Sequence, residues 1–426
     1  MKFYRYQTYK QSGIPWLYKI PEHWQVKRAK SIFKKMSRSV SDQDKIITVF
    51  RDGEVTLREN RRETGFTNAF EEMGYQGLKK GDLVFHAMDA FAGAIGVSDS
   101  DGKATPEYLV YTPIDKSKIY IPFYGLLFRQ MALSGFVLAL GKSVRERSPR
   151  FKHTKFMTLD VPIPPVEEQK EIAHYLDTKT AQIDRKIDLL TQKAQRYEEL
   201  KRAIVNETVT RGLDKSVPMK DSGIDWIGEV SEHWEVKRLK DIACQSKEKN
   251  GNNPIGEMLS VSGYRGIEFK KYDDELKKRT NDELSDYRVV RPGQLVVNTM
   301  WLNYRGIGVS KLRGYVSPAY RAYFLNKTTY GNFIHYLMRS DLYVFGYSKY
   351  LQGIRPNSLQ MKTIDFECLP MLVPPLPEQK AIAHYLDTKT AQIDQIIQTI
   401  NTQIEKLKEL RKTLINDIVT GKIKVA

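Results

Sequence analysis

The feature that most constrains the fold of this chain is an internal sequence repeat, in which one unit occurs twice. The thirteen-residue segment Ile172–Asp184 recurs without a change as Ile382–Asp394, 210 residues further along. At the same offset, residues 12–28 share Ser-Gly-Ile, Glu-His-Trp and Val-Lys-Arg with residues 222–238. Repetition at a fixed offset defines the structural unit, so it takes precedence over any local motif. The 426 residues therefore form two copies of one unit and a short tail.

Between the shared segments the two copies diverge, and their alignment slips by two residues. Gly81–Val84 matches Gly293–Val296, and Gly96–Ser98 matches Gly308–Ser310. Shared segments suit a task performed identically twice, whereas variable segments suit a task performed differently twice. Ancient duplication with unequal drift is the alternative, but drift alone does not produce sharp boundaries between identical and unrelated stretches.

Each copy ends in a pattern typical of a long helix with a narrow apolar seam. Pro164-Pro165 and Pro374-Pro375 end the preceding strands, and Gly212 and Gly421 are the expected helix stops. Apolar residues then alternate at steps of three and four, which favours a coiled coil. The seam and partner-interface residues are Ile183, Ile187, Leu190, Ile393, Ile397, Ile400, Ile404 and Leu407.

An isolated helix of this kind needs a partner, and the second copy is the nearest candidate. We expect an antiparallel pair in which Ile183, Ile187 and Leu190 meet the seam of the second helix at Ile393, Ile397 and Ile400. Two amphipathic helices, each lying on its own domain, are the alternative. The pair would act as a spacer, and each added residue would lengthen it by about 1.5 Å.

The variable bodies, roughly residues 25–163 and 235–373, predict compact mixed domains. Short β-branched and aromatic runs, separated by Gly, Asp, Asn and Pro, predict strands at Ile46–Phe50, Ile119–Ile121, Gln294–Val297 and Ala322–Phe324. Helices are expected at 124–133 and 331–338. The fold class is α+β, with two mixed α/β domains, two long helices and a pseudo-two-fold internal repeat. The expected parts are a first domain at 1–163, a helix at 164–212, a second domain at 213–373 and a helix at 374–426.

Composition favours a nucleic-acid partner inside the cell. Lys and Arg outnumber Asp and Glu by 68 to 51, which gives a formal charge of +17. No apolar run approaches the roughly 20 residues that span a bilayer, and the start of the chain lacks a signal-peptide core. Cys244 and Cys368 are the two cysteines, too few for a disulfide framework. We therefore expect a cytoplasmic protein that does not bind membranes.

The sequence lacks the common catalytic motifs, and we therefore expect no active site and no metal site. Gly135–Ser143 resembles a phosphate-binding loop, but it has five residues between its glycines where four are required. The Asn/Asp-Pro-Pro-aromatic motif of adenine methyltransferases is absent, and Asn253-Pro254-Ile255 is the nearest approach. The repeated histidines His23, His233, His174 and His384 are interpreted as packing or interface residues. The chain is therefore expected to be non-catalytic.

The order of these blocks resembles the specificity subunits of type I restriction-modification systems over essentially the whole chain. The entry motif is similar to Gln11–Trp16 with Pro21–Trp24 and to Asp221–Gly228 with Ser231–Trp234. The double prolines, followed by Glu168-Gln169-Lys170 and Glu378-Gln379-Lys380, resemble the start of the family's conserved helices. Tyr315–Tyr320 resembles a stretch inside the family's target-recognition domains. Its counterpart, Ala104–Tyr108, matches less well, which suggests a different subfamily for the first domain.

The resemblance implies that each body reads one half of an interrupted double-stranded DNA target in the major groove. It also implies two modification subunits that methylate adenine with S-adenosylmethionine, and restriction subunits that use ATP and Mg²⁺. The chain itself would bind none of these cofactors. Two copies of one partner need two equivalent surfaces, so a single chain would imitate a two-fold dimer. Systems of the type IIG kind with a separate specificity subunit share this architecture.

Loops rich in Arg, Lys, Asn and aromatic residues are the candidate DNA contacts, because phosphates attract cations and base edges are read by Arg and Asn. The candidates are Arg58, Arg61, Arg62, Arg145, Arg147, Arg150 and Lys152 in the first body, and Asn303, Tyr304, Arg305, Lys349, Arg355 and Asn357 in the second. A solvated surface charge is the alternative for each. For the whole chain, a protein-binding coiled-coil adaptor and an enzyme with an unfamiliar site remain the alternatives.

Overall fold

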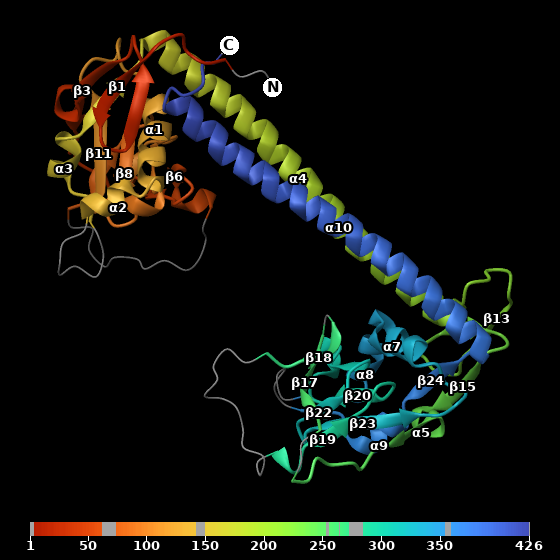
Figure 1. Ribbon diagram of the computed structural model, residues 1–426. Helices are drawn as coiled ribbons and strands as arrows, with labels where there is room; N and C mark the ends of the chain where they lie inside the picture. The colour runs from red at the N-terminus through yellow and green to blue at the C-terminus, as the bar shows by residue number, and fades with distance from the viewer. Residues whose placement is uncertain are drawn as a thin grey trace. The chain divides into compact units, whose positions relative to one another are not determined.

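The chain divides into two compact units in a computed structural model. Unit 1 comprises residues 1–189 and 402–426, and unit 2 comprises residues 190–401. Each unit thus contains one variable body and parts of both long helices (Figure 1). The structure describes residues 4–61, 74–141, 150–252, 255–263, 265–271, 284–353 and 359–425.

Unit 1 is built around a four-stranded antiparallel sheet with the strand order β4-β11-β8-β9. These strands span Phe33–Lys35, Tyr108–Pro113, Leu83–His86 and Ile95–Val97. Four two-stranded pairs surround the sheet: β1 (Tyr9–Ile14) with β2 (Leu17–Pro21), β3 (Gln25–Arg28) with β12 (Asp160–Ile163), β5 (Ile47–Val49) with β6 (Val55–Leu57), and β7 (Gln76–Leu78) with β10 (Gly102–Ala104). The helices are α1 (Ile121–Leu133), α2 (Phe136–Gly141) and α3 (His153–Met157).

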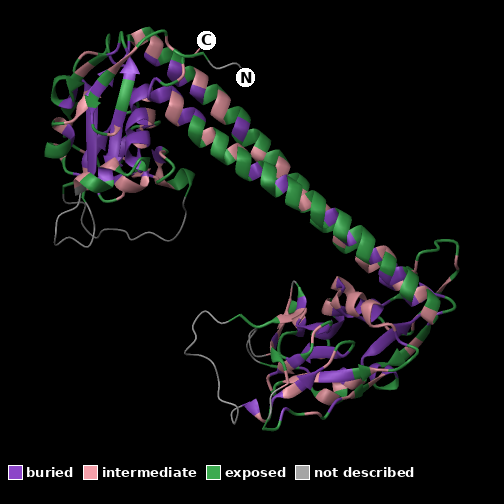
Figure 2. Ribbon diagram, viewed as in Figure 1, coloured by how far each residue is buried: buried purple, intermediate pink, exposed green. Residues whose placement is uncertain are grey.

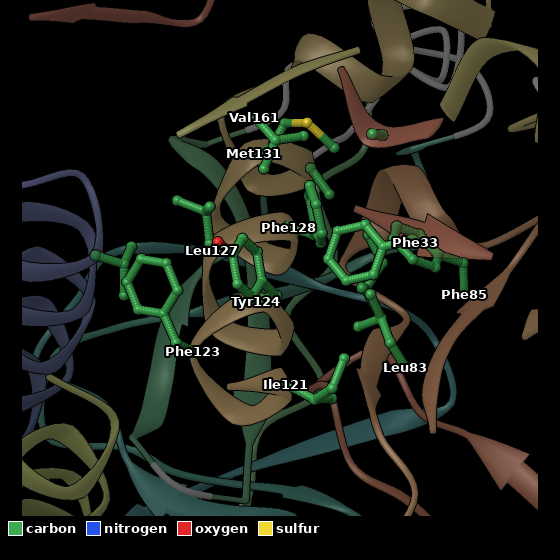
Figure 3. Close-up of a cluster of buried hydrophobic side chains, with 14 of the residues drawn as sticks. Phe33, Leu83, Phe85, Ile121, Phe123, Tyr124, Leu127, Phe128, Met131 and Val161 are labelled. Atoms are coloured by element: carbon green, nitrogen blue, oxygen red, sulfur yellow. The ribbon is translucent and has the colours of Figure 1, made fainter. Parts of the chain in front are cut away.

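The core of unit 1 lies between this sheet and α1, because both elements bury large apolar side chains on their facing surfaces. Phe128 of α1 lies 5.8 Å from the ring of Phe33 and 5.7 Å from that of Phe85. Phe156 of α3 closes the cluster at 4.9 Å from Phe85, measured between ring centroids. Figure 3 shows Phe33, Phe85 and Phe128 within this cluster of buried hydrophobic side chains. The buried positions gather in the central strands and α1 (Figure 2). Aromatic pairs at such separations add stabilisation beyond the area that they bury.

Unit 2 repeats this plan with different side chains. The sheet order β16-β23-β20-β21 uses Ala243–Gln245, Tyr320–Leu325, Leu295–Asn298 and Ile307–Val309. A second sheet, β18-β17-β22-β19, uses Gly266–Phe269, Glu257–Ser262, Gly314–Val316 and Arg288–Val290. The remaining pairs are β13 (Met219–Asp221) with β14 (Glu229–Ser231) and β15 (Glu235–Arg238) with β24 (Pro370–Val373). The helices are α5 (Leu239–Ile242), α7 (Gly331–Arg339), α8 (Asp341–Ser348) and α9 (Thr363–Glu367).

The two long helices are α4, Val166–Arg211, and α10, Leu376–Val419. Gly212 and Gly421 follow these helices with φ angles of 77° and 73°, so the prediction that they end the helices is confirmed. The predicted α+β class with two mixed bodies and a coiled coil is also confirmed. The seam residues named from the sequence are buried or half-buried.

Within each unit the helix segments run antiparallel. In unit 1, Ile183 of α4 lies in one apolar cluster with Leu407 and Leu414 of α10, and Asp184 pairs with Arg411 at 2.9 Å. In unit 2, the C-terminal part of α4 lies against the N-terminal part of α10, and Lys201 of α4 pairs with Asp394 of α10 at 2.6 Å. The expected register, with Ile183 against Ile393, is therefore wrong, because an antiparallel pair sets the start of one helix against the end of the other.

One predicted strand is also wrong. Ile119–Ile121 was expected to be extended from its β-branched and aromatic residues, but Ile121 begins α1. Pro122 sits in the first turn of α1, where a missing N–H has no cost. The backbone N–H of Tyr120, just before the helix, donates instead to Gln169 Oε1 at 2.8 Å. A long-range side-chain contact therefore overrides the local strand preference.

Candidate nucleic-acid interface

Five of the predicted DNA contacts lie outside the described residues, namely Arg62, Arg145, Arg147, Arg355 and Asn357. The described members lie in both bodies. Arg58 and Arg61 lie on and just after a 3-10 turn, η2 (Arg58–Asn60), and Arg150 and Lys152 precede α3.

In unit 1 the exposed guanidinium of Arg61 is occupied by partners from its own body. It lies 2.7 Å from both Asp52 and Glu54, and its carbon is 4.1 Å from the centre of the Phe50 ring. Exposed ion pairs of this kind contribute only about 0 to 1 kcal/mol each. Arg61 can therefore exchange these carboxylates for a phosphate with little loss of stability.

The other candidates in unit 1 differ in how firmly they are held. Arg150 pairs with Glu107 at 2.7 Å on the surface. Arg58 is half-buried, and its Nε lies 3.5 Å from Thr48 Oγ1. Lys152 is exposed at the N-cap of α3. Since a phosphate contact requires an accessible cation, Lys152 is the member of this group best suited to that role.

In unit 2, Asn303, Tyr304 and Arg305 lie together in and just after a 3-10 turn, η5 (Leu302–Tyr304), that connects β20 to β21. Arg305 has a φ angle of 56°, which is unusual for a residue with a side chain. Its guanidinium donates to the carbonyl of Arg339 at 3.1 Å and also bonds Asp341. These bonds hold Arg305 against the body, whereas Tyr304 remains 47% exposed.

Behind this turn lies a cavity of about 310 Å³, lined by residues that include Lys201, Arg305, His335 and Arg339. Burial lowers the pKa of Arg339 to about 10, and its guanidinium donates to four backbone carbonyls, with distances from 2.7 to 3.2 Å. Burial lowers the pKa of His335 to about 3. Lys201, Arg305 and Arg339 therefore already have partners, and the bonds of Arg305 and Arg339 hold the turn against the body.

Lys349 follows the last turn of α8, a helix that packs against η5. Its side chain is exposed, and its Nζ lies 5.2 Å from the centre of the Phe345 ring, which is itself exposed. An accessible cation thus lies on an element that supports the turn carrying Tyr304.

Reasoning from the sequence missed the most exposed aromatic residue of this turn, Trp301, which is 53% exposed. It also missed Asp89, which holds the same place in unit 1 and pairs with Arg51 at 2.9 Å. The two-residue slip between the copies pointed to both, because it aligns Met88 with Met300. The alignment marks the two positions as equivalent, but the turn and the exposure of Trp301 appear only in the structure.

The shared segments build the same clamp in both units. Glu168 accepts from His23 Nε2 at 2.7 Å and from Trp24 Nε1 at 3.1 Å. In unit 2, Glu378 makes the equivalent bonds to His233 and Trp234 at 2.7 and 3.1 Å. The carboxylate lies in the first turn of each long helix, where the helix dipole favours negative charge. The clamp joins each entry motif to the start of a long helix.

The described residues contain neither a cluster of metal ligands nor a membrane-spanning helix. No group of three or more His, Cys, Asp or Glu side chains in these segments is arranged to hold a metal ion. Over the same segments, no helix has the length and apolar character needed to cross a bilayer.

Comparison with known proteins adds a family description. Residues 21–199 match the family model described as the type I restriction modification DNA specificity domain. The chain is 25% identical to the putative type I restriction enzyme MjaX specificity subunit of Methanocaldococcus jannaschii, with 100% of this chain and 99% of that protein covered. It is 24% identical to the StySPI specificity subunit of Salmonella potsdam, with 64% and 59% covered.

Two solved structures share the fold. A chain described in work on complex assembly and conformational transition of the type I R-M system matches with a TM-score of 0.66 at 14% identity, covering 94% of this chain and 99% of that one. The HsdS subunit from Thermoanaerobacter tengcongensis matches with a TM-score of 0.59 at 16% identity, covering 97% and 100%. Both matches extend over the two bodies and the long helices.

Proposed function

We propose that this chain is a specificity subunit of a type I restriction-modification system and that it reads a bipartite DNA target, one half with each body. The observation that carries this proposal is the contrast between shared and variable parts. The clamps of Glu168 and Glu378 are the same to within 0.1 Å, whereas the side chains of the equivalent turns differ, with Trp301 in unit 2 where unit 1 has Asp89. A protein that reads two different half-sites from one scaffold needs this combination.

The described surface chemistry supports DNA as the ligand. The formal charge of +17 favours a polyanion, and exposed cations such as Lys152 and Lys349 lie on elements next to the variable loops. We assign the thirteen DNA contacts predicted from the sequence as part of the same proposal, including those outside the described residues.

The proposed partners are two modification subunits, which carry S-adenosylmethionine and methylate adenine, and restriction subunits that use ATP and Mg²⁺. Chemistry resides on these partners, and this chain directs them to the target. The repeated segments supply two equivalent surfaces, which a duplicated partner requires. We place the partner-facing residues along the two helices, around the seam from Ile183 to Leu407.

The function is tested by co-expressing the chain with its modification subunits and mapping methylated adenines across a genome. We expect an interrupted motif with two defined halves. Exchanging residues 25–163 for the body of another family member should change one half and leave the other intact. A concerted change in both halves would contradict independent reading, and protein binding without any methylated motif would favour an adaptor.

Electrostatic contacts have a separate test in binding assays at several salt concentrations. Lys349→Ala should weaken the complex with all DNA sequences and lower the salt slope by about one unit. Lys116→Ala is the matched control, because this exposed lysine is not among the predicted contacts. Equal salt slopes for the two variants would remove Lys349 from the interface.

A further inference from the structure

Unit 2 displays a pair of aromatic side chains in the turn between β20 and β21. Trp301 is 53% exposed and Tyr304 is 47% exposed, and their ring centroids lie 5.4 Å apart. All five tryptophans lie in described segments, and Trp301 is the one classed as exposed. Exposed aromatic groups of this size signal a binding surface, because their apolar area is normally removed from water.

The turn is held rigidly before any ligand arrives. The carbonyl of Trp301 accepts the N–H of Tyr304 at 3.0 Å and that of Gly306 at 2.8 Å, and the N–H of Asn298 donates to the carbonyl of Gly306 at 2.7 Å. Among the residues that the structure describes, Arg305 is the one non-glycine residue with positive φ. Its bond to Asp341 holds this strained residue in place. The rings are therefore presented at little further entropic cost.

The same backbone turn occurs in unit 1 with different side chains. The carbonyl of Asp89 accepts the N–H groups of Ala92 and Ala94 at 2.9 and 3.3 Å, in the pattern made by Trp301 in unit 2. Gly93 takes the left-handed position, with φ of 93°, that Arg305 occupies in unit 2. Asp89 replaces the indole and pairs with Arg51. The two bodies thus share the backbone of this turn but differ in its side chains, which is expected where two domains recognise different DNA sequences.

We propose that Trp301 and Tyr304 stack on bases of the DNA bound by unit 2, beside a base that has left the helix. This inference rests on the proposed function. Aromatic rings stack on base faces whatever the sequence, and apolar wedges fill base steps that have been unstacked. A methyltransferase reaches its target atom only after the base has been extruded, which leaves a gap to be filled.

The charge around the pair favours DNA over a protein partner. Lys349 is exposed at the end of α8, the helix that packs against this turn, and the chain as a whole carries +17. A ring that enters DNA beside phosphates needs such cations nearby. The equivalent turn of unit 1 carries Asp89, paired with Arg51, in place of the indole, so we place the aromatic wedge in the half-site of unit 2 alone.

The test uses the complete complex with its modification subunits and a duplex carrying its methylated motif. The half-site of unit 2 is the one that does not change when residues 25–163 are exchanged. 2-Aminopurine placed at successive positions reports unstacking, and Trp301 supplies an intrinsic signal through quenching by acrylamide. We expect DNA to protect Trp301 from acrylamide and 2-aminopurine to brighten in the half-site of unit 2.

Trp301→Ala should weaken binding by roughly 5- to 150-fold, the equivalent of about 1 to 3 kcal/mol for one stacked base. Trp301→Phe should retain most of the affinity, because it keeps an aromatic face. Asp89→Ala in unit 1 is the matched control, and it should leave the 2-aminopurine signal of the other half-site unchanged. Unaltered thermal unfolding of each variant establishes that the turn has kept its fold.

Three outcomes would overturn the proposal. The first is wild-type affinity for Trp301→Ala, and the second is acrylamide quenching that DNA does not alter. The third is protection of Trp301 by modification subunits alone, which would assign the pair to a protein interface. A complex that binds no duplex at all would instead refute the proposed function, so the two failures are distinguishable.

Discussion

Gln169 fastens the first body to the first long helix, and its removal gives a sharp test of how the units are anchored. This residue is fully buried. Its Nε2 donates to the carbonyls of Lys118 at 3.0 Å and Pro164 at 2.8 Å, and its Oε1 accepts from the N–H of Tyr120 at 2.8 Å. Gln169→Ala leaves these three backbone groups without their side-chain partner.

The magnitude follows from the number of groups affected. The bond to Pro164 is buried, and those to Lys118 and Tyr120 are partly buried. A buried polar group left unpaired costs about 1 to 3 kcal/mol, and with the lower figure for each the three together cost about 3 kcal/mol. For a unit of about two hundred residues, each kcal/mol lowers the melting temperature by roughly 2 to 4 °C. We therefore expect a decrease of roughly 6 to 12 °C in the transition of unit 1.

Calorimetry combined with hydrogen exchange resolves which unit is affected. Amides around residues 114–121 should exchange faster in Gln169→Ala, whereas those of unit 2 should not change. Gln379→Ala should do the reverse, because Gln379 makes the same three bonds at 2.7, 3.1 and 2.8 Å. Gln182→Ala, at an exposed position of α4, is the control. A decrease below about 2 °C, or faster exchange in both units, would refute the reasoning.

Three further predictions address pH, the helix ends and the helix length. Burial lowers the folded-state pKa of His335 to about 3, so the unfolded chain alone binds this proton between about pH 6.5 and pH 3. Stability of unit 2 should thus fall as pH falls through that window, by at most about 1.4 kcal/mol per pH unit, and urea titrations of His335→Gln should show a weaker pH dependence. Gly421→Ala should destabilise its unit more than Gly212→Ala in thermal melts, because the new Cβ at 421 would lie 2.5 Å from the ring of Pro21, whereas the atom nearest to a Cβ at 212 is an oxygen of Glu378 at 2.8 Å. Equal losses would contradict this. Adding one heptad to each long helix lengthens it by roughly 10 Å and, if the helices set the gap between half-sites, should widen the methylated motif by about three base pairs. An unchanged gap in an active variant would exclude the helices as the spacer.

The architecture was largely readable from the sequence because repetition and periodicity are strong signals. The long helices, their glycine stops and several strands followed from apolar spacing and from Gly and Pro positions. The strand expected at Ile119–Ile121 failed, because Tyr120 is bonded to Gln169, which lies 49 residues away. No local pattern contains that contact.

The candidate interface was less predictable, because residue type does not reveal what a side chain contacts. Arg305 was predicted to contact DNA from its charge, and nothing in the sequence indicates that its guanidinium also bonds Asp341 and a backbone carbonyl. Trp301 was overlooked because tryptophans are usually buried, as Trp24 and Trp234 are. Its exposure depends on a turn whose hydrogen bonds appear only in three dimensions.

The bonds of Gln169 and Gln379, together with the clamps of Glu168 and Glu378, explain how the sequence of a body can vary while the body stays attached to its long helix. Gln169 reaches the first body through backbone atoms of Lys118 and Tyr120, and Gln379 reaches the second through backbone atoms of Thr328 and Tyr330. Backbone N–H and C=O groups are present whatever the side chain, so these bonds place no demand on the sequence of the body. The side chains that the clamps do require, such as Trp24 and Trp234, belong to the shared segments. A body can therefore exchange the residues that meet DNA while the same amide continues to hold it to the helix, and this separation of anchoring from reading is what makes exchange of residues 25–163 physically reasonable.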